Sequence, residues 1–170
     1  MAQFVHLTPE KNVAAIRRSG IKARNLGGDL GRGVFAMPVV PDFFVSHQWL
    51  RELKRGGQRT ICGVYFRVPD DQPVHVGHYA SASREMSAAE AVGVIMARES
   101  AEGYEIAVPR RIEAAEVFRV RHLPQVVGWR YAPGVRGIWN GCGCPVCVPP
   151  GGINARKKRE HWEAEEYGDV

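Results

Sequence analysis

The sequence predicts an α+β fold in one compact domain, and three observations lead to this prediction. The chain has 170 residues, a length that suits one domain rather than two. Hydrophobic residues make up 45% and charged residues 24%, so the composition is that of a globular protein and argues against a disordered chain. Segments typical of strands and of helices are mixed along the chain, without the strict alternation that indicates a parallel α/β sheet.

Short segments that are rich in β-branched and aromatic residues and bounded by turn-forming residues predict the strands. These segments are residues 4–7, 34–37, 60–68, 74–76, 104–108 and 115–121. In the last of them apolar residues alternate with arginines over 118–121, and Val117 interrupts the alternation. A glycine-rich stretch over 25–33 predicts a loop, which lacks the Gly-Lys-Ser/Thr ending of a phosphate-binding loop.

Apolar periodicity and end signals predict three short helices, over 9–19, 42–55 and 83–99. Thr8 is the expected N-cap of the first helix, and Gly20 is its expected stop. Ser87 and Glu90 have the spacing of a capping box in the third segment.

The net charge of +5 permits a polyanionic partner without demanding one. Basic residues cluster at 17–24 and at 156–159, and a plain solvated surface is the alternative explanation of both clusters. The longest stretch without a charged residue, 137–155, is too crowded with Gly, Pro and Cys to form a membrane-spanning helix. The first residues also lack the basic and apolar regions of a signal peptide. We therefore expect a cytoplasmic protein without a membrane partner.

Three of the four cysteines are close together, at Cys142, Cys144 and Cys147. Three thiolates in a tight, glycine-containing turn can face one zinc ion, which then needs a fourth ligand. The candidates for that ligand are His161, His122 and Cys62. The alternative is a set of reduced thiols that bind no metal, and both interpretations remain open.

Three polar residues in or beside the predicted strands are candidates for a functional site. Strand alternation places His6 and Thr8 on one face at a strand end, where a His and a Thr can both hydrogen-bond a ribose hydroxyl. The simpler alternative makes His6 a structural histidine and Thr8 only a helix cap. Glu105 lies in a strand where glutamate is uncommon, so it either faces solvent or lines a site.

Three segments in sequence order resemble motifs of the ADP-ribosyltransferase superfamily. His6-x-Thr8-x-x-x-Asn12 and the residues up to Ile21 are similar to the opening strand and helix of the DNA-modifying ADP-ribosyltransferase toxins and of the RNA 2′-phosphotransferases. Gly31-Arg-Gly-Val-Phe-Ala36 resembles a stretch of the poly(ADP-ribose) polymerases that precedes a helix lining the nicotinamide pocket. Residues 104–109 look like the late strand that carries the catalytic glutamate of the superfamily.

This resemblance implies a split, strongly curved β-sheet with a cleft for NAD. His6 would bond a ribose hydroxyl of NAD with support from Thr8, and Glu105 would accept a hydrogen bond from the 2′-hydroxyl of the nicotinamide ribose. An aromatic side chain would stack on nicotinamide. The residues implied to be catalytic are Glu105 and His6, and those implied to contact NAD are His6, Thr8, Gly33, Phe35, Phe43 and Phe44.

The sequence leaves the acceptor and the final assignment open. Phe35 replaces the usual tyrosine of the second motif, and Gly103 stands where arginine-modifying transferases carry a second acid. The main hypothesis is an enzyme that transfers ADP-ribose from NAD to DNA, RNA or protein. The first alternative is a non-catalytic module that binds nucleic acid or a protein through residues 126–170, an extension of the domain at 1–125 that is rich in Cys, Trp and basic residues. A lesser alternative is an RNA 2′-phosphotransferase.

Overall fold

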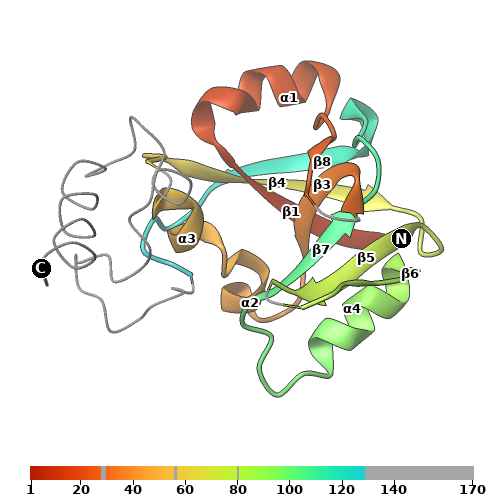
Figure 1. The fold of residues 1–170 in the computed structure, drawn as a ribbon. Helices are drawn as coiled ribbons and strands as arrows, with labels where there is room; N and C mark the ends of the chain where they lie inside the picture. Colours follow the sequence, from red (N-terminus) through yellow and green to blue (C-terminus); the bar gives the residue numbers. More distant parts are fainter. Residues whose placement is uncertain (28–29, 56, 80, 129–170) are drawn as a thin grey trace, which may run out of the picture.

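A computed structural model describes residues 1–27, 30–55, 57–79 and 81–128 (Figure 1). Its strands form one antiparallel sheet of eight strands in the order β6-β5-β7-β3-β1-β4-β8, with β2 paired to β3 beside this path. The strands are β1 (Ala2–Pro9), β2 (Arg24–Asn25), β3 (Arg32–Pro38), β4 (Ile61–Val68), β5 (Pro73–His78), β6 (Arg84–Ser87), β7 (Tyr104–Val108) and β8 (Val117–His122). The α+β class is therefore confirmed, and each predicted strand is present.

The sheet opens between β1 and β3, which are neighbours for only part of their length. The paired residues of these two strands are Phe4 with Pro38 and Val5 with Met37. From His6 onward β1 stays paired with β4, whereas Val34–Ala36 of β3 pairs with β7 on its other side. Two halves of the sheet thus diverge at one point, and a site can form where backbone groups of β3 have no strand partner in β1.

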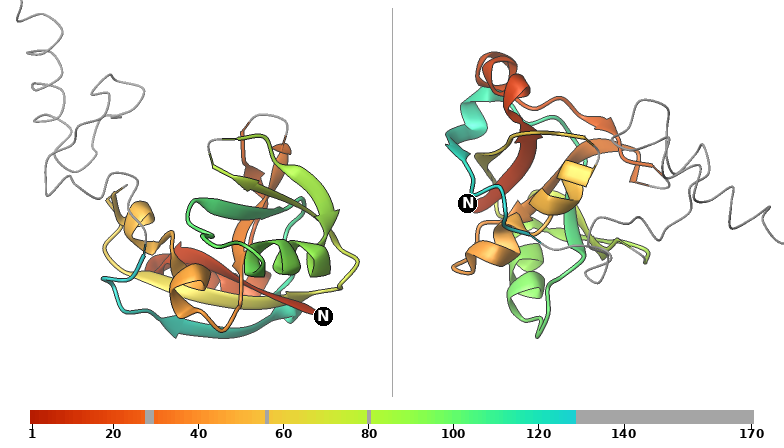
Figure 2. Two further views of the ribbon diagram at one scale, coloured as in Figure 1. Left: turned by 90° about the horizontal axis from the view of Figure 1, so that it is seen from below. Right: turned by 90° about the vertical axis from the view of Figure 1, so that its left-hand side faces the viewer.

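In the described ranges, four short α-helices and two 3₁₀ turns accompany the sheet. They are η1 (Glu10–Asn12), α1 (Val13–Ser19), α2 (Phe43–His47), α3 (Leu50–Arg55), α4 (Ala88–Met96) and η3 (Ala114–Glu116). Figure 2 shows α1, the α2–α3 pair and α4 at separate places around the sheet, with β8 at its outer edge.

The first predicted helix is present, but Thr8 is not its N-cap. Pairing of β1 with β4 continues as far as Pro9 and Ile61, so Thr8 is part of the strand. No side chain caps η1, and the Thr8 hydroxyl instead accepts a hydrogen bond of 3.1 Å from the amide of Asn12. Gly20 ends α1 as predicted, with φ at 73°, a conformation that favours glycine.

The second predicted helix, over 42–55, is in fact two helices, because tertiary hydrogen bonds hold the residues between them. The buried Gln48 side chain donates to Ala101 O over 2.8 Å and accepts from Gly103 N over 2.8 Å. The next residue, Trp49, donates from its indole to Tyr104 O over 2.8 Å. These bonds tie the break between α2 and α3 to the loop that leads into β7.

The third predicted helix begins later than expected, at Ala88. Residues 84–87 form β6 and pair with β5, so the helical prediction for them is wrong. The capping box is confirmed: Ser87 Oγ accepts from Glu90 N, and the Glu90 carboxylate accepts from Ser87 N. The capping box marks the true helix start, which the wider periodicity of 83–99 obscured.

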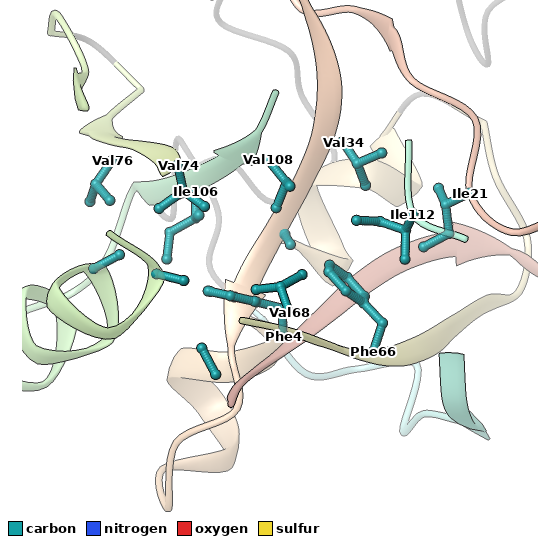
Figure 3. Packing of buried hydrophobic residues seen from close by; sticks show 14 of the residues in the cluster. Phe4, Ile21, Val34, Phe66, Val68, Val74, Val76, Ile106, Val108 and Ile112 are labelled. Atoms are coloured by element: carbon teal, nitrogen blue, oxygen red, sulfur yellow. The ribbon is translucent and has the colours of Figure 1, made fainter. Parts of the chain in front are cut away.

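The main hydrophobic core lies on one face of the sheet and includes Phe4, Phe66, Ile106 and Ile112, all fully buried (Figure 3). A second, smaller cluster lies on the other face, where Val5, Met37 and Tyr65 pack with side chains of the α2–α3 segment. The centre of the sheet is thus covered on both faces, which explains the nearly continuous burial of β4.

Candidate functional site

The imidazole of His6 occupies the opening between β1 and β3. Its Nδ1 lies 2.8 Å from the carbonyl oxygen of Phe35. Because a carbonyl oxygen can only accept, Nδ1 carries the proton, and Nε2 of the neutral ring is left as an acceptor. Burial lowers the pKa of His6, the bond to Phe35 partly offsets this, and the charge of Arg24 lowers it further. The ring is therefore neutral at pH 7.

A hollow of about 770 Å³ lies beside this ring, between β1, α1 and β3. His6, Thr8, Gly33 and Phe35, four of the predicted NAD contacts, line it. Three further residues of the lining are cationic, and no acidic residue belongs to the described lining. The cationic residues are Lys11, Lys22 and Arg24. The hollow therefore suits a ligand that has both hydroxyl groups and negative charge.

Glu105 lines a second hollow, of about 320 Å³, on the β5–β7 side of the opening. Its neighbours in β7, Tyr104 and Ile106, pack with the main core on the other face of the sheet. The side chain is half-buried, and burial raises the pKa of its carboxyl group above the ordinary value. Within the described part of the chain nothing forms a hydrogen bond or ion pair with this carboxylate. The Glu105 side chain thus lines a hollow and does not stand fully in solvent, and its role in a site stays a prediction.

Phe35 lies between the two hollows and, together with Leu26, lines both. His6 and Glu105 are therefore on two adjoining hollows that share these two residues, rather than in a single one. Phe43 and Phe44, the other candidates for stacking on nicotinamide, line neither of these hollows and lie on α2 with exposed rings.

Gly33 has a structural reason to be glycine. A Cβ atom at this position would collide with Val108 O and lie 2.9 Å from Cδ1 of Leu26. The glycine thus permits the close approach of β7 to β3 that sets Glu105 near Phe35.

Two histidines that the sequence analysis did not select lie near Glu105. His75 and His78 of β5 line the smaller hollow, and the register pairs His75 with Ala107 and Gly77 with Glu105. Nε2 of His75 is also 3.9 Å from the exposed carboxylate of Glu85. The short predicted strand over 74–76 gave no reason to select these two histidines from the sequence. Only the pairing of β5 with β7 brings them close to Glu105.

The predicted zinc ligands Cys142, Cys144 and Cys147 lie outside the described residues. Of the candidate fourth ligands, Cys62 is buried, and its Sγ is 3.7 Å from Nδ1 of His122. Burial raises the pKa of the Cys62 thiol. Among the residues that the structure describes, no group of three His, Cys, Asp or Glu side chains is arranged to hold a metal ion. The zinc site stays a prediction.

None of the helices in the described ranges combines the length and the apolar character that a membrane crossing requires. Comparison of the chain with protein-family models, with curated proteins and with solved structures finds no match.

Proposed function

We propose that this protein is an ADP-ribosyltransferase-like enzyme, with NAD as its ADP-ribose donor and a nucleic acid or a protein as acceptor. One observation carries the proposal: a neutral His6 with a free acceptor nitrogen and an unpartnered carboxylate of Glu105 line two hollows that share Phe35. The opening of the sheet between β1 and β3 supports it, because the resemblance implies a split sheet.

NAD would lie along the two adjoining hollows. A ribose hydroxyl donates to Nε2 of His6, and the nicotinamide ring stacks on Phe35. The two negative charges of the diphosphate lie in the larger hollow, whose cationic lining residues Lys11, Lys22 and Arg24 attract them. The 2′-hydroxyl of the nicotinamide ribose donates to the carboxylate of Glu105.

The reaction breaks the bond between C1′ of the ribose and the pyridinium nitrogen. The electron pair leaves with nicotinamide and neutralises its ring, so positive charge develops on the ribose. The Glu105 carboxylate stabilises this charge at short range in a site with little water. The acceptor then forms a bond to C1′ and loses its proton to the same carboxylate, which its raised pKa makes a better base.

Calorimetric titration with NAD, together with an assay of nicotinamide release, tests the proposal. The chain should bind NAD, and His6→Ala should weaken that binding. Glu105→Gln should retain the fold and NAD binding but lose at least about 100-fold in turnover, the contribution expected of such a group. Glu102→Gln, an exposed acid in the loop before β7, is the matched control and should leave turnover unchanged. Absence of NAD binding, or full turnover of Glu105→Gln, would refute the proposal.

The acceptor is identified by supplying labelled NAD with single-stranded DNA, RNA or protein extract and following the label. A 2′-phosphorylated RNA belongs in the same series. NAD consumption that occurs only with this RNA would assign the phosphotransferase reaction instead.

A further inference from the structure

A row of four rings runs from α2 to β8 on the face of the sheet opposite the main core. We call Phe43, His47, Tyr65 and Phe118 the aromatic row. Their ring centroids are separated by 4.0, 6.0 and 6.3 Å in that order. The two middle rings are buried, whereas Phe43 is 44% and Phe118 37% exposed. The row therefore presents one open aromatic ring at each end.

Hydrogen bonds hold the middle of the aromatic row in place. Nδ1 of His47 donates to the carbonyl of Phe43 over 2.7 Å, which leaves Nε2 as an acceptor for the Tyr65 hydroxyl at 2.8 Å. Both rings are thereby locked, and the exposed rings stand on a rigid support rather than on a loop.

A β-bulge explains why Phe118 belongs to this row. The register of β4 with β8 shifts between Tyr65 and Phe66: Tyr65 is opposite Arg119, and Phe66 is opposite Val117. Phe118 is the extra residue of the bulge. A bulge re-aims side chains, and here it brings Phe118 to the face that carries Arg119. Strict alternation over 118–121 would have put these two residues on opposite faces.

Three arginines lie along the aromatic row on β4 and β8. The guanidinium of Arg67 lies 4.4 Å from the ring centroid, and Arg119 and Arg121 project from β8 opposite Tyr65 and Gly63. All three arginines are exposed. Among the described residues, no carboxylate pairs with any of them and no group accepts a hydrogen bond from them. We call these arginines and the aromatic row the Arg–aromatic face.

We propose that the Arg–aromatic face binds single-stranded nucleic acid. Three uncompensated positive charges complement a phosphate backbone, and the exposed rings of Phe43 and Phe118 offer surfaces on which unpaired bases stack. The face is a strand edge with a short helix beside it and presents no long helix that could enter a duplex groove, so single strands are favoured over duplex. The inference does not depend on the proposed function, because the nucleic acid binds without NAD.

Fluorescence anisotropy with labelled 12-mers of single-stranded DNA and RNA tests this inference on the full 170-residue chain. Binding should weaken with salt, and Arg119→Ala combined with Arg121→Ala should reduce the slope of log K against log salt by about 1.4, at about 0.7 per phosphate contact. Phe118→Leu keeps an apolar side chain but removes the ring, and should lower the affinity about five-fold or more.

A matched double variant on another element keeps the test specific to this face. Arg17→Ala combined with Arg18→Ala removes two exposed arginines from α1 and should leave the slope nearly unchanged. A loss as large as that of the β8 pair would assign binding to net charge alone and overturn the inference, as would an absence of binding by the unchanged chain.

Three further measurements separate this inference from its competitors. If the Arg–aromatic face instead binds anionic lipid, the unchanged chain will sediment with phosphatidylserine vesicles. The Arg119→Ala/Arg121→Ala variant, the β8 double variant, will then lose this sedimentation but keep its oligonucleotide binding. Glu105→Gln should bind the oligonucleotide like the unchanged chain, and the β8 double variant should bind NAD normally. The failure of one proposal is therefore distinguishable from the failure of the other.

Discussion

Replacement of Gln48 by methionine tests how the α2–α3 segment supports the strand that carries Glu105. Gln48 is fully buried and makes two hydrogen bonds of 2.8 Å, to Ala101 O and from Gly103 N. Methionine has a similar length and fills the space, but it leaves Gly103 N without its partner, whereas Ala101 O still accepts from Tyr104 N over 3.2 Å. A buried polar group left unsatisfied costs about 1–3 kcal/mol, so the substitution should lower the free energy of unfolding by about 1–3 kcal/mol. That is a large part of the total stability of a small domain.

Urea denaturation with linear extrapolation measures this change, on the condition that the slope m stays constant. Gln3→Met is the matched control, because Gln3 is exposed on β1; its effect should stay within about 0.5 kcal/mol. A loss below about 1 kcal/mol for Gln48→Met would show that water or a shifted loop satisfies Gly103 N and that Gln48 does not anchor this loop. A loss within the expected range, together with reduced turnover, would link the break between the helices to the position of Glu105.

Three further predictions concern the opening of the sheet, the aromatic row and a helix end. Burial lowers the pKa of His6 in the folded chain, so the unfolded chain binds a proton at this residue more readily than the folded chain does. The stability that His6 contributes is therefore fully present above pH 6.5 and is lost as the pH falls toward the lowered pKa. The fall in unfolding free energy between pH 7 and pH 5 should therefore be smaller in His6→Gln than in the unchanged chain, and an equal fall would contradict the neutral ring. Tyr65→Phe should cost about 1–3 kcal/mol in urea denaturation, because Nε2 of the buried His47 loses its donor; an unchanged midpoint would mean that the bond adds nothing. Gly20→Ala should lower the melting temperature clearly, because the residue has φ at 73° and its Cβ would strike Ile112 O, whereas Gly93→Ala in α4 meets open space and should be neutral or stabilising by up to about 1 kcal/mol. Equal effects of the two alanines would contradict this explanation.

Where the local signal was strong, the sequence was enough to predict the element. The run over 60–68 is β-rich and became β4, and the spacing of Ser87 and Glu90 marked a real helix start. Local signals were misleading where two structures competed. Residues 84–87 fit a helical periodicity, but a place beside β5 makes them a strand, because the hydrogen bonds of a sheet come from a partner elsewhere in the chain.

The sequence by itself determined the α+β class and singled out His6 and Glu105 as unusual polar residues in strands. It had no means of showing that the two lie on adjoining hollows that share Phe35, that His75 lies near Glu105, or that a bulge turns Phe118 toward the arginines of β8. Each of these facts depends on strand register, since a shift of one residue moves a side chain to the other face of the sheet. Register is set by long-range packing, and so only the tertiary structure decided which candidate residues meet.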